Sequence, residues 1–490
     1  MLTQRPIASA PIGTSGTSDF VIHLDSGSFT LSMKGAAKLI TNVKLPGEFL
    51  INGQAITFTT AMNVDLASGS FSVTGQDVIL RTGKVITAES RTYTYTGQAI
   101  GTAIAVSIPL DSGTFEITDQ TAAVTAQLNM SLDSGTFTYT GQTIPKKVTE
   151  VIDSGSFTYS GQDVGLTKVM IISAESGSFA LTGQDVTGAT TRQSDSGSFS
   201  LTGNDVVLNI AMNVVLDDVA FETTGQDIGT TKAMNIDLDS GTFTVTGQNI
   251  TEDITEVVDA GSFTYSGQVI NFPIAMSFAA EAGSFALTGQ DVTGDIVEVV
   301  TAGSFTLTGN DVGFTKAMSV DVDSGSFAFT GQDASFAIAL NISLDSGTFT
   351  VTGQNITEDI TEIVDAGSFT YSGQPVSLNK AMNVTADAGS FALTGEDIDF
   401  GLAFSMVAES GTFALTGQPI PKSISERLDS GTFTYSGQNI SFKQGVFSGS
   451  FELTVELTGV QVWGQLIPDQ NPSWAAISPN QNPNWQQLVA

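Results

Sequence analysis

One phrase, close to DSGSFTLTGQDV, recurs along almost the whole chain, and the spacing of its copies limits the possible folds more than any other feature. Its aromatic residue occurs in 21 units, and neighbouring aromatics are 22 or 20 residues apart, except for the last pair, which are 18 apart. Side chains alternate between two faces along a strand, so these even spacings keep every aromatic on the same face. Helical units would show no such restriction. The sequence therefore predicts an all-β tandem repeat of 20–22 residues.

Within one unit, the pattern predicts strands separated by turns. Around Phe71, apolar residues alternate with polar ones in the stretch 62–66 and again at Phe71 and Val73, and Val78 resumes the apolar side with inverted parity. Gly-Gln and Asp-Ser-Gly mark the turns, where Asp accepts backbone hydrogen bonds and Gly supplies a positive φ. We expect the aromatics to form a buried core ladder, represented in the middle of the chain by Phe243, Phe263, Phe285, Phe305, Phe327 and Phe349.

A longer period accompanies the short one. Residues 238–268 reappear at 344–374 with a single change, Val257 to Ile363, which is an offset of 106 residues or five units. This block duplication indicates a quasi-one-dimensional chain that tolerates lengthening. We favour a β-solenoid, in which each unit is one coil, because the two strand segments of a unit differ in length. The alternative is an antiparallel β meander or a row of small β-sandwich domains, because the same turns also suit hairpins. We expect an N-terminal arm over 1–18, a β-repeat body over 19–455 and a C-terminal cap or anchor over 456–490.

Composition excludes several classes of function. The 17 Lys+Arg and 50 Asp+Glu give a net charge of −33, which argues against binding to nucleic acid. Cysteine is absent and His23 is the single histidine, so thiolate chemistry and multi-histidine metal sites are excluded. No stretch of about 18 apolar residues occurs, so we expect no membrane insertion. We predict no catalytic residues and no enzyme.

Recurring acids suggest one candidate cofactor, Ca²⁺. Asp or Glu stands four residues before most of the aromatics, as at Asp111, Asp133 and Asp239. In a stack of coils such carboxylates would lie about 5 Å apart and repel one another, and a hard cation would relieve this. The other interpretation is that Asp caps the turns and keeps a long β structure soluble.

The two ends of the chain lack the repeat. The N-terminal segment contains Pro6 and Pro11, and the C-terminal segment contains Trp463, Trp474 and Trp485, which are the only tryptophans. Proline ends regular strand pairing, and tryptophan is enriched at binding hot spots. These five residues are the candidate attachment sites, with a structural cap as the other interpretation of the C-terminal segment.

The repeat phrase, the opening RPIASAPIG and the closing W-x-x-I-x-P-x-Q-N-P-x-W resemble repeat-rich virion proteins of tailed bacteriophages, particularly marine ones. The resemblance implies a structural virion component, such as a tail fibre, a head fibre or a tail-surface protein, assembled in the host cytoplasm. It implies other virion proteins as partners, a homo-oligomer, and a host cell-surface glycan as a candidate attachment target.

Two other functions fit the repeats. A bacterial surface adhesin or biofilm matrix protein could use similar acidic β repeats, although no secretory signal is visible at the N-terminus. A glycan-degrading β-helix enzyme would need a pair of carboxylates, which should break the pattern at one place.

Overall fold

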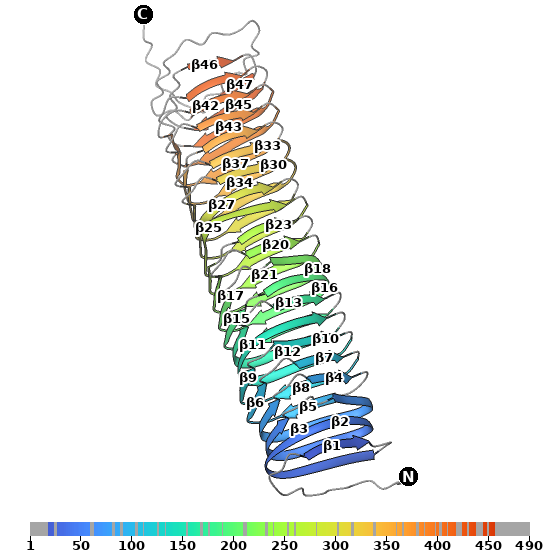
Figure 1. Ribbon diagram of the computed structural model, residues 1–490. Helices are drawn as coiled ribbons and strands as arrows, with labels where there is room; N and C mark the ends of the chain where they lie inside the picture. The colour runs from blue at the N-terminus through green and yellow to red at the C-terminus, as the bar shows by residue number, and fades with distance from the viewer. Residues whose placement is uncertain are drawn as a thin grey trace, which may run out of the picture. The chain divides into compact units, whose positions relative to one another are not determined.

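The even spacing of the repeats becomes the register between neighbouring strands. In the computed structural model, Phe157 lies opposite Phe179, and Phe179 lies opposite Phe199, in strands that run parallel. The same parallel register joins successive strands in both halves of the chain. Each chain segment therefore returns to the same side after one full coil, and the fold is a parallel β-solenoid (Figure 1). The antiparallel meander and the row of sandwiches are wrong, since both require antiparallel neighbours.

The structure describes residues 18–455 apart from short segments. Those left out are 24–26, 59–62, 81–83, 89–91, 103–105, 111, 125–126, 133, 153–154, 167–169, 175–176, 189, 209–212, 231–233, 239, 252–253, 259–260, 281, 301–302, 315–317, 337–339, 359, 365–366, 379–381, 387, 397, 401–403, 409, 418–423, 429–430, 438–443 and 448–449. Two compact units, Met1–Thr255 and Glu256–Ala490, make up the chain. All the regular elements described in them are strands.

A coil has three strand positions. The aromatic strand comes first, as in β14 (Ser178–Thr182), a short corner strand follows the Gly-Gln turn, as in β15 (Asp185–Gly188), and a return strand leads to the next coil. The corner strand is the segment to which Val78 belongs in its own coil. The sequence predicts this separate segment because Val78 is apolar at an odd offset from Phe71. Several strands of the first unit continue through more than one position without a break.

The strands of the first unit fall into these positions. Aromatic strands are β5 (Thr92–Thr96), β8 (Thr114–Thr118), β14 and β21 (Thr242–Thr246). Corner strands are β6 (Ala99–Thr102), β9 (Thr121–Val124), β15, β17 (Asp205–Leu208), β19 (Asp227–Thr230) and β22 (Asn249–Thr251). Return strands are β1 (Ser18–His23), β4 (Lys84–Ala88), β7 (Val106–Leu110), β10 (Gln127–Leu132), β13 (Met170–Ala174) and β20 (Met234–Leu238). Continuous strands are β2 (Gly27–Phe58), β3 (Asn63–Leu80), β11 (Thr136–Ile152), β12 (Ser156–Leu166), β16 (Thr190–Thr202) and β18 (Asn213–Thr224).

The division between the units falls in the return strand β23 (Ile254–Val258). In the second unit the aromatic strands are β24 (Ser262–Ser266), β26 (Ser284–Thr288), β28 (Ser304–Thr308), β31 (Ser326–Thr330), β34 (Thr348–Thr352), β37 (Ser368–Gly373), β40 (Ser390–Gly395), β43 (Thr412–Gly417), β45 (Thr432–Gly437) and β47 (Ser450–Val455). Corner strands are β29 (Asp311–Phe314), β32 (Asp333–Phe336), β35 (Asn355–Glu358), β38 (Val376–Leu378) and β41 (Ile398–Phe400). Return strands are β30 (Met318–Val322), β33 (Leu340–Leu344), β36 (Ile360–Val364), β39 (Met382–Ala386), β42 (Phe404–Ala408), β44 (Ile424–Leu428) and β46 (Gln444–Phe447). Two strands, β25 (Val269–Ala280) and β27 (Asp291–Val300), span a corner and a return.

Stacked aromatic rings fill the core of each unit. The six rings named from the sequence are all buried, with at most 1% of their surface exposed: Phe243, Phe263, Phe285, Phe305, Phe327 and Phe349. In the second unit, the ring centroids of Phe305 lie 4.8 Å from Phe285 and 4.6 Å from Phe327, with planes 5° and 3° apart. Parallel strands about 4.8 Å apart place identical side chains at this stacking distance.

Two further columns complete the core beside the rings. Residues two positions after the aromatic, such as Leu287 and Leu307, are buried on the same face of the strand. Residues seven positions after it, such as Val292 and Val312, are buried from the corner strand. The odd offset of seven is allowed because the Gly-Gln turn lies between the two strands and changes the direction of the chain.

Truncating one ring should damage the stack locally. Phe305→Ala removes a ring that contacts one ring on either side, and we expect a loss of about 3–5 kcal/mol in local stability, because a cavity remains between fixed coils. Hydrogen exchange should accelerate in the coils of Phe285, Phe305 and Phe327 and stay unchanged elsewhere, since contacts are mainly between neighbouring coils.

Thr306→Ala, on the outward side of the same strand, is the matched control and should change exchange little. A uniform acceleration along the second unit would contradict nearest-neighbour stabilisation.

Candidate functional site

The outward side of the aromatic strands carries hydroxyl groups in rows. In each coil the outward residues stand one position before, one after and three after the aromatic, as with Thr348, Thr350 and Thr352 around Phe349. Over the nine coils from Phe263 to Phe433, these positions hold 14 Thr, 9 Ser and 4 Ala and nothing else. None of them is buried. We call this surface the hydroxyl face of the second unit.

The corresponding face of the first unit is less uniform. Glu116 and Glu222 occupy two of its central positions, and each carboxylate accepts a hydrogen bond from a threonine two residues further on. Charge therefore interrupts the hydroxyl rows of the first unit, whereas those of the second unit are uncharged between Ser262 and Ser436.

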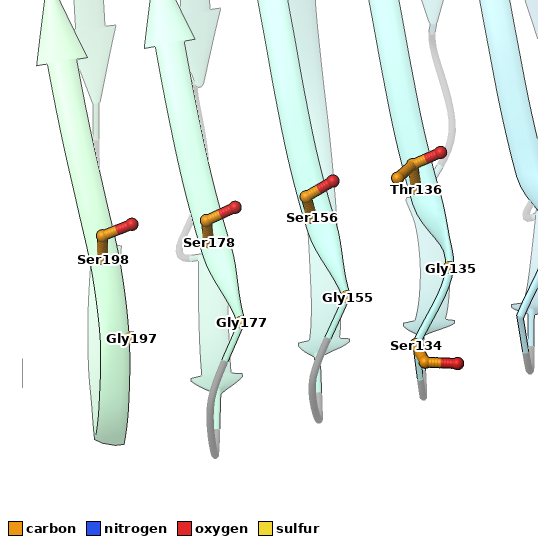
Figure 2. A pocket seen from close by; sticks show the side chains of 9 residues that line it. All are labelled: Ser134, Gly135, Thr136, Gly155, Ser156, Gly177, Ser178, Gly197 and Ser198. Carbon is orange, nitrogen blue, oxygen red and sulfur yellow. The ribbon is translucent and has the colours of Figure 1, made fainter.

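A shallow groove borders the hydroxyl rows where the aromatic strands begin. In the first unit it has a volume of about 340 Å³ and is lined by Ser134, Gly135, Thr136, Gly155, Ser156, Gly177, Ser178, Gly197 and Ser198. Figure 2 shows the hydroxyls of Thr136, Ser156, Ser178 and Ser198 in a row, one per coil, above the glycines. A similar groove of about 260 Å³ lies at the same repeat positions in the second unit, lined among others by Gly367, Ser368, Gly389 and Ser390.

Glycine forms the floor of the grooves for a reason that differs from the sequence prediction. A positive φ occurs at Gly69 and Gly197, and the prediction of positive φ is wrong for Gly135 and Gly367. At these positions the backbones of successive coils approach too closely for a side chain. A Cβ on Gly135 would lie 2.5 Å from the carbonyl oxygen of Gly113, and one on Gly367 would lie 2.5 Å from that of Gly347.

An acidic column runs along the corner strands. In the first unit, aspartates of successive coils pair across neighbouring strands, and all four are exposed: Asp163, Asp185, Asp205 and Asp227. The column ends at Asn249, whose Nδ2 donates a hydrogen bond of 2.6 Å to Oδ1 of Asp227.

The second unit repeats this arrangement with three aspartates, Asp291, Asp311 and Asp333, followed by Asn355, which donates to Asp333. Exposure to water weakens the repulsion within each column. Among the residues that the structure describes, no group of three or more acidic or histidine side chains is arranged to hold a metal ion.

One buried carboxylate breaks the repeat. Asp119 stands where the neighbouring units have Gly97 and Gly141, and only 6% of it is exposed. The hydroxyl of Tyr139 donates a 2.7 Å hydrogen bond to Oδ2 of Asp119. Burial, together with this hydrogen bond and the nearby negative charge, raises the pKa of Tyr139 well above its usual range. The sequence signal is TDQ at residues 118–120 in place of the usual TGQ, and the repeat pattern alone does not predict the burial of this carboxylate.

The other candidate residues from the sequence lie outside the described residues. These are the attachment candidates Pro6, Pro11, Trp463, Trp474 and Trp485 and the calcium candidates Asp111, Asp133 and Asp239. The predicted arm and cap fall in the same undescribed ends, apart from Ser18. No helix capable of crossing a membrane occurs in the part of the chain that the structure describes.

No protein-family model, no curated protein and no solved structure matches this chain.

The groove glycines provide a test of coil spacing. Gly367→Ala should destabilise the second unit by about 1–3 kcal/mol, because its methyl group would overlap the backbone of the preceding coil. Gly313→Ala is the matched control: its Cβ would lie 4.0 Å from the nearest atom, the carbonyl oxygen of Ser335, which is ordinary contact. Urea unfolding of both variants should show the loss for Gly367→Ala only. Equal midpoints would contradict the close approach.

Two buried tyrosines of the first unit should respond oppositely to loss of their hydroxyls. The hydroxyl of Tyr95 is buried without a hydrogen-bond partner, whereas that of Tyr139 bonds to Asp119. Tyr95→Phe should raise the free energy of unfolding by about 1 kcal/mol, because an unsatisfied polar group is removed. Tyr139→Phe should lower it by about 1.5–3 kcal/mol, because the buried carboxylate loses its donor.

Chemical denaturation of the two variants measures both changes, and each serves as the other's control, since both lose one hydroxyl from a buried ring. Changes of the same sign would show that the Asp119 hydrogen bond does not stabilise the unit.

Proposed function

We propose that this chain is a structural protein of a tailed-phage particle, a fibre-like or surface component without enzymatic activity, joined to other virion proteins through its unique ends. The observation that carries the proposal is the repetition of one coil geometry: the same ring stack, the same core columns and the same parallel register recur throughout each unit. Such a body sets a distance and provides a stiff support.

Coil uniformity supports attachment through the ends. A partner that recognised one coil would find the same phrase in its neighbours, so the repeats alone can hardly define a unique position. The non-repeating ends, 1–18 and 456–490, occur once, and the second contains all the tryptophans. Proline-containing segments with large aromatic side chains suit docking onto another protein.

The distribution of charge supports a role in a crowded assembly. The exposed aspartate columns and the net charge of −33 produce repulsion between copies at a distance. This repulsion opposes side-by-side aggregation of β structures, which are otherwise prone to associate.

Deletions in the chain test the proposal. Particles carrying a chain without 456–490 should lose the protein, whereas particles carrying a chain without 239–344 should retain it. The second deletion is the matched control, because it removes five whole repeats, leaves Leu238 joined to Asp345 in the original phrase, and preserves both ends. Cryo-electron microscopy and quantitative mass spectrometry of purified particles measure incorporation.

Normal incorporation of a chain that lacks both ends would overturn the attachment mechanism. Absence of the intact protein from particles, together with its recovery on the surface of bacteria, would instead support the adhesin or matrix interpretation.

A further inference from the structure

We propose that copies of this chain join head to tail, with the last coil of one copy docking onto the first coil of the next. The observation that carries the proposal is a pair of open sheet edges. At the end of the second unit, β47 pairs with β45 and β46 pairs with β44, each on one side. At the start of the first unit, β1 pairs with β2 on one side. Among the described residues no strand covers the other sides, and such edges carry backbone donors and acceptors that can pair with another chain.

The two open edges match in strand order. A coil contains three strand positions, so an edge could fall at any of them. Here both edges present a return strand followed by an aromatic strand: β46 and then β47 at the end, and β1 and then the first segment of β2, 27–32, at the start. A second copy would therefore continue the stack as one further parallel coil. The repeat also sets the register, because Phe29 and Leu31 stand at the repeat positions of Phe451 and Leu453.

Backbone hydrogen bonds within the chain show which groups face each edge. The N–H one position before an aromatic donates to the preceding coil, as from Thr432 to the carbonyl oxygen of Gly411 over 3.0 Å. The N–H four positions after an aromatic donates to the following coil, as from Gly289 to the carbonyl oxygen of Thr308 over 2.9 Å. The donors of one aromatic strand therefore alternate between its two parallel neighbours.

This alternation makes the two edges complementary. In the first coil, the N–H groups of Ser28, Thr30 and Ser32 face the open edge, and in the last coil those of Phe451 and Leu453 do. Docking in register directs the N–H of Thr30 to the carbonyl oxygen of Phe451, and the N–H of Leu453 to the carbonyl oxygen of Thr30. A second copy would thus be held by the same ladder that joins neighbouring coils within the chain.

The distribution of charge favours contact between the ends of two copies. The corner position, six residues after the aromatic, holds no acid before Asp77 or after Asp397. Residues 18–58 contain three lysines and three acids, in a chain whose net charge is −33. Acidic columns repel one another when copies lie side by side, whereas contact between the ends brings no acidic corner columns together. Because this contact joins two different edges, it is heterologous and produces an open chain of copies.

The test follows the mass of the purified full chain by sedimentation. The average mass of the parent should exceed that of one copy and rise with concentration. Thr30→Pro removes a donor that faces the open edge and leaves the hydrogen bonds to its own next coil, so this variant should sediment as a single copy. Thr30→Ala is the matched control, because it loses the same side chain but keeps the N–H, and it should associate as the parent does.

A mixing experiment separates a blocked edge from misfolding. Thr30→Pro keeps the open edge of its last coil, so it should still dock onto the first coil of one parent copy. In large excess it should therefore shorten the parent assemblies to pairs, with twice the mass of one copy. A misfolded variant would leave the parent assemblies unchanged.

Several outcomes would overturn the proposal. These are a parent chain that stays a single copy, equal association of Thr30→Pro and Thr30→Ala, and a Thr30→Pro variant that does not shorten the parent assemblies. A single-copy parent that associates once 456–490 is removed would identify that segment as the occupant of the last edge instead. Association of purified copies requires no phage particle, so its failure and a failure of incorporation are measured separately.

Discussion

Parallel, in-register stacking of one coil on the next is the constraint on which the rest of the structure depends. Strands about 4.8 Å apart bring equivalent residues of successive coils into contact. The residue type at each repeat position must therefore pack well against the same type in the next coil. Phenylalanine satisfies this by ring stacking, with planes 3° apart between Phe305 and Phe327. Glycine satisfies it where backbones meet, as at Gly135, and aspartate satisfies it only where water reaches the carboxylates.

The same constraint explains why exceptions to the repeat are informative. A polar residue in a core column has no equivalent partner in the next coil, so its hydrogen bonds must be supplied individually. Asp119 obtains one from Tyr139, which belongs to the following coil. Thr223, with 2% of its surface exposed, stands in a column that holds Leu201 in the preceding coil and Val245 in the next. At such positions one coil differs from its neighbours, so the hydrogen bonds there belong to a single coil and are not repeated along the fold.

Much of the architecture could be predicted because parity is a strong signal. The even spacing placed Phe305 and its equivalents on one buried face, and the inverted parity of Val78 predicted its burial. The residues alone favour the solenoid but do not exclude the antiparallel meander, because Gly-Gln and Asp-Ser-Gly serve hairpins and coil corners equally. The role of Gly135 depends on the approach of a coil 22 residues away, and the burial of Asp119 depends on a tyrosine in another coil. Neither is a local property of the sequence.

Folding and function place different demands on the two sides of an aromatic strand. Packing restricts the inward residues to apolar types. The column that contains Leu287 holds Val, Leu, Tyr and Phe in different coils, which shows how much variation the core allows. The outward columns of the second unit vary less than this, although solvent tolerates more than a core does. The aromatic column varies least of all, since it holds phenylalanine in all nine coils from Phe263 to Phe433. On the corresponding face of the first unit, Glu48, Glu116 and Glu222 stand at outward positions, so the solvent side of an aromatic strand accepts charge where the inward side does not.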